Sequence, residues 1–120
     1  MGDPGRGETI MEWTKIEHFA KIRPADTTAA DLHVAHCLAA AAAGDVDACY
    51  ELGVVHSTGS HGVAPDLIEA HKWFNLAAAN GHDEAARCRA DVSDEMTARE
   101  IAEAQRRARE WLSAETRRAA

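Results

Sequence analysis

Small residues recur at regular intervals between residues 52 and 86. Two large aromatic residues, Trp73 and Phe74, lie in that stretch with alanines three or four positions away on either side. This spacing places rings and alanines on one face of a helix, where small side chains let a neighbouring helix approach closely. The small residues are Gly53, Gly59, Gly62, Ala70, Ala77, Ala78, Gly81 and Ala85. Because aromatic residues make up only 5% of the 120 residues, we expect an all-α domain built by close helix packing.

Sequence signals mark where the helices begin and end. At three places a capping side chain precedes an acid by three positions, a pattern that satisfies free backbone amides at a helix N-terminus. Gly44 and Gly81 mark two helix ends, since glycine readily adopts the left-handed conformation that closes a helix. The capping pairs are Thr28 with Asp31, Asp66 with Glu69, and Thr97 with Glu100. The expected helices cover about residues 28–43, 46–57, 67–80, 83–95 and 98–115.

Aligning the two glycines, which lie 37 residues apart, reveals an internal repeat. The segment AAAAGDVDA at residues 40–48 falls on AAANGHDEA at residues 77–85. Such a period is typical of helix-pair solenoids, in which each unit buries its apolar face against its neighbours. The facing stripes of the central pair are Ala48, Leu52, Val55 and His56 on one helix, and Ala70, Trp73, Phe74, Ala77 and Ala78 on the other. We expect Gly53 to leave a bare patch for an aromatic ring of the partner helix.

Residues 48–85 resemble one complete Sel1-like repeat, a helix–loop–helix motif. The matching positions are Ala48, Leu52, Gly53, Gly59, Gly62, Val63, Asp66, Ala70, Trp73, Phe74, Ala77, Ala78, Gly81 and Ala85. The segment departs from the family pattern at His56, where tyrosine is usual, and at Ser60 and His61 in the loop. The resemblance implies a short right-handed α-solenoid of about five antiparallel helices, related to tetratricopeptide repeats. It also implies a protein that acts as an adaptor in protein complexes.

The segments on either side resemble the repeat less closely. Residues 28–44 are similar to the second helix of a preceding repeat, but His36 and Cys37 stand where the aromatic pair would align. After Ala85 the glycine-rich loop is missing, and the resemblance implies an irregular capping hairpin with Trp111 packed back on the stack.

The first 27 residues form a separate segment. Their opening, MGDPGRGE, is rich in glycine and charge, which favours disorder. A short amphipathic stretch follows and stops before Pro24, because the residue preceding a proline disfavours helical angles. Its apolar residues are Trp13, Ile16, Phe19 and Ala20. We therefore predict a flexible segment at residues 1–27 and a Sel1-like helical domain at residues 28–116.

The charge distribution disfavours a nucleic-acid partner. Residues 24–96 hold three Lys or Arg against twelve Asp or Glu, and the whole chain has a net charge of -7. The later arginines Arg106, Arg107 and Arg109 are interpreted as a solvated helix face. No apolar run approaches the ~20 residues that a membrane-spanning helix needs.

Cysteine usage and the N-terminal composition favour a cytoplasmic protein. The three cysteines Cys37, Cys49 and Cys88 are an odd number without disulfide-type spacing, and we interpret them as small buried hydrophobes. The first 23 residues balance four acidic against four basic groups and contain no apolar signal region.

The residue pattern offers little support for catalysis. Acidic surroundings should raise the thiol pKa of Cys49 and Cys88, which disfavours a nucleophilic role. The first-turn acids Asp45, Asp47, Asp83 and Glu84 fit helix-dipole stabilisation better than acid–base chemistry. We therefore predict no enzymatic activity, no catalytic residue and no cofactor.

The seven histidines invite a metal-binding interpretation. His33 and Cys37 are four positions apart, as two ligands of one zinc ion on a helix would be, and His36 lies between them. The residues His56, His61 and Cys88 could also converge in space. Ordinary packing is the favoured interpretation, so a metal site remains the least favoured alternative.

The leading functional hypothesis is a non-enzymatic protein–protein interaction module. It would bind a protein or peptide of basic character on the concave face formed by the first helix of each pair. The residues expected to line this face are Tyr50, Glu51 and Val54 on one helix and Arg87, Cys88 and Asp91 on the next. The alternative is a homodimer or longer self-assembly, because a stack of so few repeats would gain burial from a second copy.

Overall fold

The computed structural model describes residues 29–119 and confirms the all-α prediction for them. Five α-helices and one short 3-10 turn are present over this range, without a strand. The elements are α2 (Ala29–Ala42), α3 (Val46–Thr58), η1 (Ser60–Gly62), α4 (Leu67–Ala79), α5 (Asp83–Ser93) and α6 (Ala98–Ala119). The expected helix ends hold to within two residues, except that α6 continues four residues beyond position 115. Thr28 and the amphipathic stretch of residues 1–27 lie outside the described residues.

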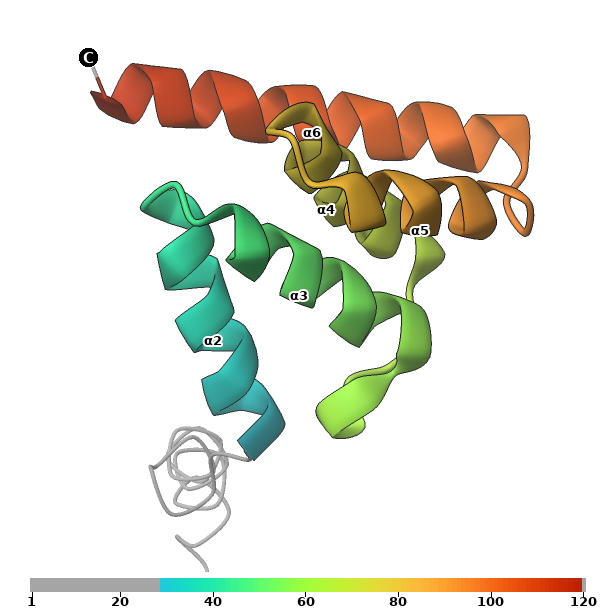
Figure 1. Ribbon diagram of the computed structural model, residues 1–120, viewed down its shortest axis with the longest axis horizontal. Coiled ribbons are helices and arrows are strands. Elements are labelled where there is room, and N and C mark those ends of the chain that lie inside the picture. The colour runs from blue at the N-terminus through green and yellow to red at the C-terminus, as the bar shows by residue number, and fades with distance from the viewer. Residues whose placement is uncertain (1–28, 120) are drawn as a thin grey trace, which may run out of the picture.

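Helix α4 is the centre of the packing. It contacts α3, α5 and α6, while α2 packs on α3. Figure 1 shows α6 running along the top of the molecule, in the reverse direction to α5. The main packing partner of α6 is nevertheless α4. This succession of antiparallel helices is consistent with a short helical-repeat stack.

The contact between α3 and α4 is as close as the sequence predicted. Trp73 and Phe74 are each 1% exposed, and Leu52 and Val55 opposite them are fully buried. A Cβ atom added to Gly53 would lie 2.4 Å from Cδ1 of Phe74, a distance that real Cβ atoms do not show. The bare patch at Gly53 therefore holds the Phe74 ring.

The predicted capping signals operate at two helix starts. Asp66 Oδ1 accepts hydrogen bonds from the amides of Ile68 and Glu69, both at 3.1 Å. At the start of α6 the exchange is reciprocal: the Thr97 amide donates to Glu100 Oε1 at 2.8 Å, and the Glu100 amide donates to Thr97 Oγ1 at 3.1 Å.

Two further caps were not predicted as such. Asp45, interpreted as a first-turn acid, is the N-cap of α3 and accepts from the amides of Asp47 and Ala48. His82 caps α5, where its Nδ1 atom accepts from the Ala85 amide at 3.1 Å. A histidine is an unusual cap, so composition alone does not indicate it.

Gly44 and Gly81 close two helices in the same manner. Their φ angles are 97° and 94°, in the left-handed region that favours glycine. The amide after each glycine reaches back five residues, from Asp45 to the Ala40 carbonyl and from His82 to the Ala77 carbonyl. These are Schellman-type ends, and they confirm the alignment of the two segments.

The prediction of a solvated arginine face on α6 was wrong for Arg107. Its Nη1 atom lies 2.7 Å from Glu69 Oε2 on α4, and its Nε atom lies 2.8 Å from Glu103 Oε2 on its own helix. Arg107 therefore joins α6 to α4, whereas the acids that pair with Arg106 within residues 29–119 both belong to α6, and Arg109 is exposed.

Trp111 packs back on the stack as expected. Its ring meets the edge of Trp73 with 4.8 Å between centroids, and Ala104 and Ala108 of the same helix are buried beside it. No helix within the described part of the chain is long and apolar enough to cross a membrane.

Candidate functional site

The predicted concave face brings together residues of α3 and α5. The Tyr50 ring stacks on His82, with 4.4 Å between centroids and 14° between planes, and also lies against Phe74. Burial raises the pKa of the Tyr50 phenol, and the neighbouring Cys88 thiol adds to that rise. Tyr50 and Cys88 are thus side by side although 38 positions separate them.

The other predicted residues of this face differ in their surroundings. Val54 is half-buried against the core. Arg87 and Asp91 are exposed on α5, and the Arg87 Nη2 atom lies 2.6 Å from Glu84. Glu51 is engaged with α2 instead, since its Oε2 atom lies 3.3 Å from His33 Nε2.

Acidic side chains border these residues. The Asp47 side chain is 91% exposed at the start of α3, and Glu84 is 52% exposed at the start of α5. Together with Glu51 and Asp91 they outnumber Arg87, so the surface beside Tyr50 is acidic.

The three thiols are poorly suited to nucleophilic chemistry. Cys37 and Cys49 are buried and Cys88 is half-buried, and all are free. Burial is the main cause that raises the pKa of each thiol, and nearby carboxylates such as Asp45 raise that of Cys49 further. The thiols therefore stay protonated near neutral pH, and the structure supports the expectation for Cys49 and Cys88, with burial rather than charge as the larger cause.

The histidine predictions have mixed outcomes. His33 Nε2 does lie 3.7 Å from Cys37 Sγ, but His36 is exposed and belongs to no ligand cluster among residues 29–119. The suggested convergence of His56, His61 and Cys88 was wrong. His61 instead stacks on His33, with 4.1 Å between ring centroids.

One buried histidine, His71, was not predicted from the sequence. His71 on α4 is 3% exposed, and its Nδ1 atom has no hydrogen-bond partner in the described part of the chain. Burial, with a smaller effect from Arg89, lowers its pKa, so the ring is held neutral. Its burial makes it an interior residue of α4 rather than a surface one.

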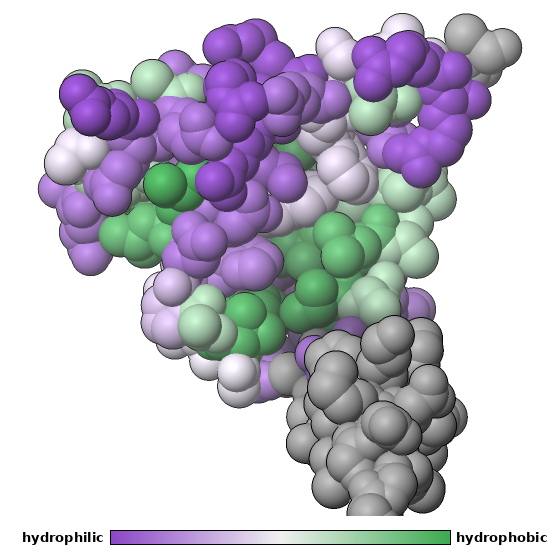
Figure 2. Space-filling view, turned by 180° about the vertical axis from the view of Figure 1, so that it is seen from behind, coloured by the Kyte–Doolittle hydropathy of each residue, from purple (hydrophilic) through white to green (hydrophobic). Residues whose placement is uncertain are grey.

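The surface is polar where α6 crosses the top of the molecule and more apolar below it (Figure 2). Between α4 and α6 lies an open groove of about 420 Å³. Its charged side chains already pair with one another, Glu69 with Lys72 and Arg107, and Glu103 with Arg106. The groove therefore offers few unpaired groups to a ligand.

The comparison with protein families agrees with this architecture. The Sel1 repeat family matches residues 46–82, which hold α3, the loop and α4. No curated protein and no solved structure matches the chain. Sel1 repeats are helical units that generally mediate protein–protein interactions and are typically non-catalytic. The chain therefore contains one Sel1 repeat, at residues 46–82.

Proposed function

We propose that this protein is a non-enzymatic adaptor that binds a basic protein or peptide segment on the face formed by α3 and α5. The residues that would contact the partner are Tyr50, Glu51, Val54, Arg87, Cys88 and Asp91. The observation that carries the proposal is the half-buried Tyr50, which stacks on His82 and lies close enough to Glu51 and Glu84 for their carboxylates to raise its pKa. An amphipathic ring beside an acidic rim suits an anchor that is apolar at its centre and basic at its edge.

The interaction can be tested with peptides selected from a random displayed library. We expect the selected peptides to carry net positive charge and to perturb the backbone amide signals of α3 and α5 in nuclear magnetic resonance spectra. The double substitution Glu51→Lys with Asp91→Lys should weaken their binding at least about tenfold, because opposite charge becomes like charge. Unaltered binding, or signals that move only on α6, would contradict the proposal.

A matched control exists in the loop that follows α5. The double substitution Asp94→Lys with Glu95→Lys makes the same change of net charge at two exposed positions outside the proposed face. This control should bind the peptides almost as well as the native chain. An equal loss in both double variants would indicate a general effect of charge rather than a defined surface.

Self-assembly is a second candidate, favoured by exposed leucines at two places. Leu32 and Leu38 on α2 are 61% and 38% exposed, and Leu112 on α6 is 48% exposed. Apolar side chains at the end of a repeat stack gain burial when two copies pair. Light scattering over a range of concentrations tests this candidate, and a monomeric mass at the highest concentration would reject it.

A further inference from the structure

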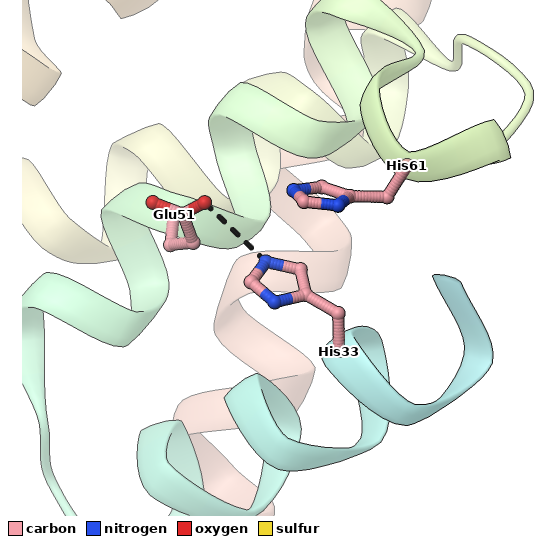
Figure 3. A group of neighbouring side chains, drawn as sticks. All are labelled: His33, Glu51 and His61. Atoms are coloured by element: carbon pink, nitrogen blue, oxygen red, sulfur yellow. Dashed lines mark hydrogen bonds and ion pairs between the residues drawn. The ribbon is translucent and has the colours of Figure 1, made fainter. Parts of the chain in front are cut away.

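Three potential metal ligands meet where α2, α3 and the η1 turn come together. Figure 3 shows His33 from α2, Glu51 from α3 and His61 from η1 directed toward one another. Each offers one ligand atom, and these atoms all lie within 4.8 Å of one another. Within residues 29–119 this is the only such group of three or more ligand-type side chains.

The stacking of the two imidazoles is compatible with a shared ion. Their centroids are 4.1 Å apart and their planes differ by 27°, so the two rings are stacked with their faces slightly inclined to each other. The Glu51 carboxylate lies at the His33 Nε2 edge, 3.3 Å away. Ligands about 2.1 Å from a tetrahedral zinc ion lie about 3.4 Å apart. Small side-chain rotations would therefore bring all three ligand atoms onto one ion.

The donor set selects the class of ion. Two imidazoles and one carboxylate suit zinc and similar divalent transition metals, whereas calcium and magnesium require mainly oxygen ligands. The side chains of His33 and Glu51 are 30% and 42% exposed and His61 is exposed, so an ion can enter from solvent. With three protein ligands, the fourth coordination position of a tetrahedral ion would be filled by water, as in three-ligand zinc sites.

We propose that His33, Glu51 and His61 bind one divalent transition-metal ion, for which Zn²⁺ is the natural probe. The bound ion joins α2 and the loop of the Sel1 repeat to α3. The His33–Glu51 pair joins only α2 to α3, and the ring stack joins only α2 to η1. A bound ion would hold all three segments together. This site is separate from the Tyr50–Cys88 contact, although Glu51 is shared with the proposed partner-binding face.

The test uses the full chain without an affinity tag, after treatment with a chelator. Calorimetric titration with Zn²⁺ should show one ion per chain, and Co²⁺ should give the visible absorption of a tetrahedral complex. Zn²⁺ should also raise the midpoint of thermal unfolding, since an ion that binds only the folded chain stabilises it.

Three substitutions remove one ligand each, and a fourth serves as a matched control. His33→Gln, Glu51→Gln and His61→Asn should each weaken Zn²⁺ binding by more than about tenfold. Asparagine is chosen at His61 because φ there is 57°, a left-handed conformation that asparagine tolerates. His36→Gln removes an exposed histidine from the same helix as His33 and should leave the affinity unchanged.

The results separate a metal site from a purely structural contact. If the three side chains only pack together, the substitutions alter the unfolding midpoint of the metal-free chain while Zn²⁺ has no effect on native or variant protein. Absence of stoichiometric binding, or equal binding by His33→Gln and His36→Gln, would overturn the proposal. Peptide binding should survive His33→Gln, so failure here and failure of the adaptor proposal are distinguishable.

Discussion

Helix α4 is held on two sides in different ways. Against α3, the contact consists of Phe74 lying on Gly53 with fully buried neighbours. Against α6, buried alanines and Trp111 are supplemented by Arg107, whose guanidinium bridges Glu69 and Glu103 at the protein surface. The first contact depends on the fit of rigid groups, and the second also uses long, partly exposed side chains.

The two contacts should differ in how well they tolerate substitutions. Interiors packed as tightly as the α3–α4 contact cannot absorb an added or missing group without strain or a cavity. Surface ion pairs contribute little each and are screened by salt. We therefore expect the α3–α4 contact to dominate stability and the charged part of the α4–α6 contact to modulate it.

The largest effect should follow the loss of the Phe74 ring. Phe74→Ala leaves a cavity between α3 and α4 and should lower the free energy of unfolding by about 3–5 kcal/mol. Urea unfolding followed by circular dichroism measures this change. Gln105→Ala, which shortens an exposed side chain of α6, is the control and should change stability by less than about 0.5 kcal/mol. Similar losses in the two variants would contradict the assigned importance of the α3–α4 contact.

A single added methyl group at Gly53 tests the fit more finely. Gly53→Ala places a Cβ atom 2.4 Å from Phe74 Cδ1, and the overpacking should cost about 1–3 kcal/mol. In an open helix the same substitution stabilises by up to about 1 kcal/mol, so the sign itself is informative. The cost should shrink in a Phe74→Leu background, where part of the ring is absent. A Gly53→Ala variant more stable than the native chain would show that α3 and α4 are further apart than described.

The ion pairs of α6 should have a smaller effect that salt reduces. Arg107→Met keeps most of the side-chain length but removes the bridge to Glu69, and should cost about 0.5–1 kcal/mol at low salt. Arg109→Met removes the same charge from an exposed position of the same helix and is the matched control. Thermal unfolding at low and high salt should show the Arg107 effect fading while the Arg109 variant changes little. A loss that is independent of salt would assign the effect to packing of the arginine stem.

The smallest expected effect is the pH dependence from Glu103. Hydrogen bonds from Arg106 and Arg107 lower its pKa from 4.5 to about 2. Because the folded pKa is the lower one, its stabilisation is complete above pH 4.5 and is lost as pH falls toward 2. Glu103→Gln should therefore reduce the unfolding midpoint slightly at neutral pH, and the difference from the native chain should disappear near pH 2. Glu95→Gln, at an exposed carboxylate in the loop before α6, should show no comparable difference at either pH.

Local features of the sequence determined most of the helical architecture. The capping side chains Asp66 and Thr97 and the closing glycines Gly44 and Gly81 act within one helical turn, so their neighbours in sequence suffice to predict them. The fit of Phe74 on Gly53 was also predictable, because its small-and-large spacing belongs to a repeat whose two helices adjoin in sequence.

Contacts between distant segments were decided by the tertiary structure alone. Arg107 reaches Glu69 only because α6 crosses α4, and no spacing along the chain specifies that crossing. The meeting of His33, Glu51 and His61 likewise depends on how α2 and the loop lie against α3. Helix periodicity defines which face a residue occupies, whereas the angle and register between packed helices define which faces meet.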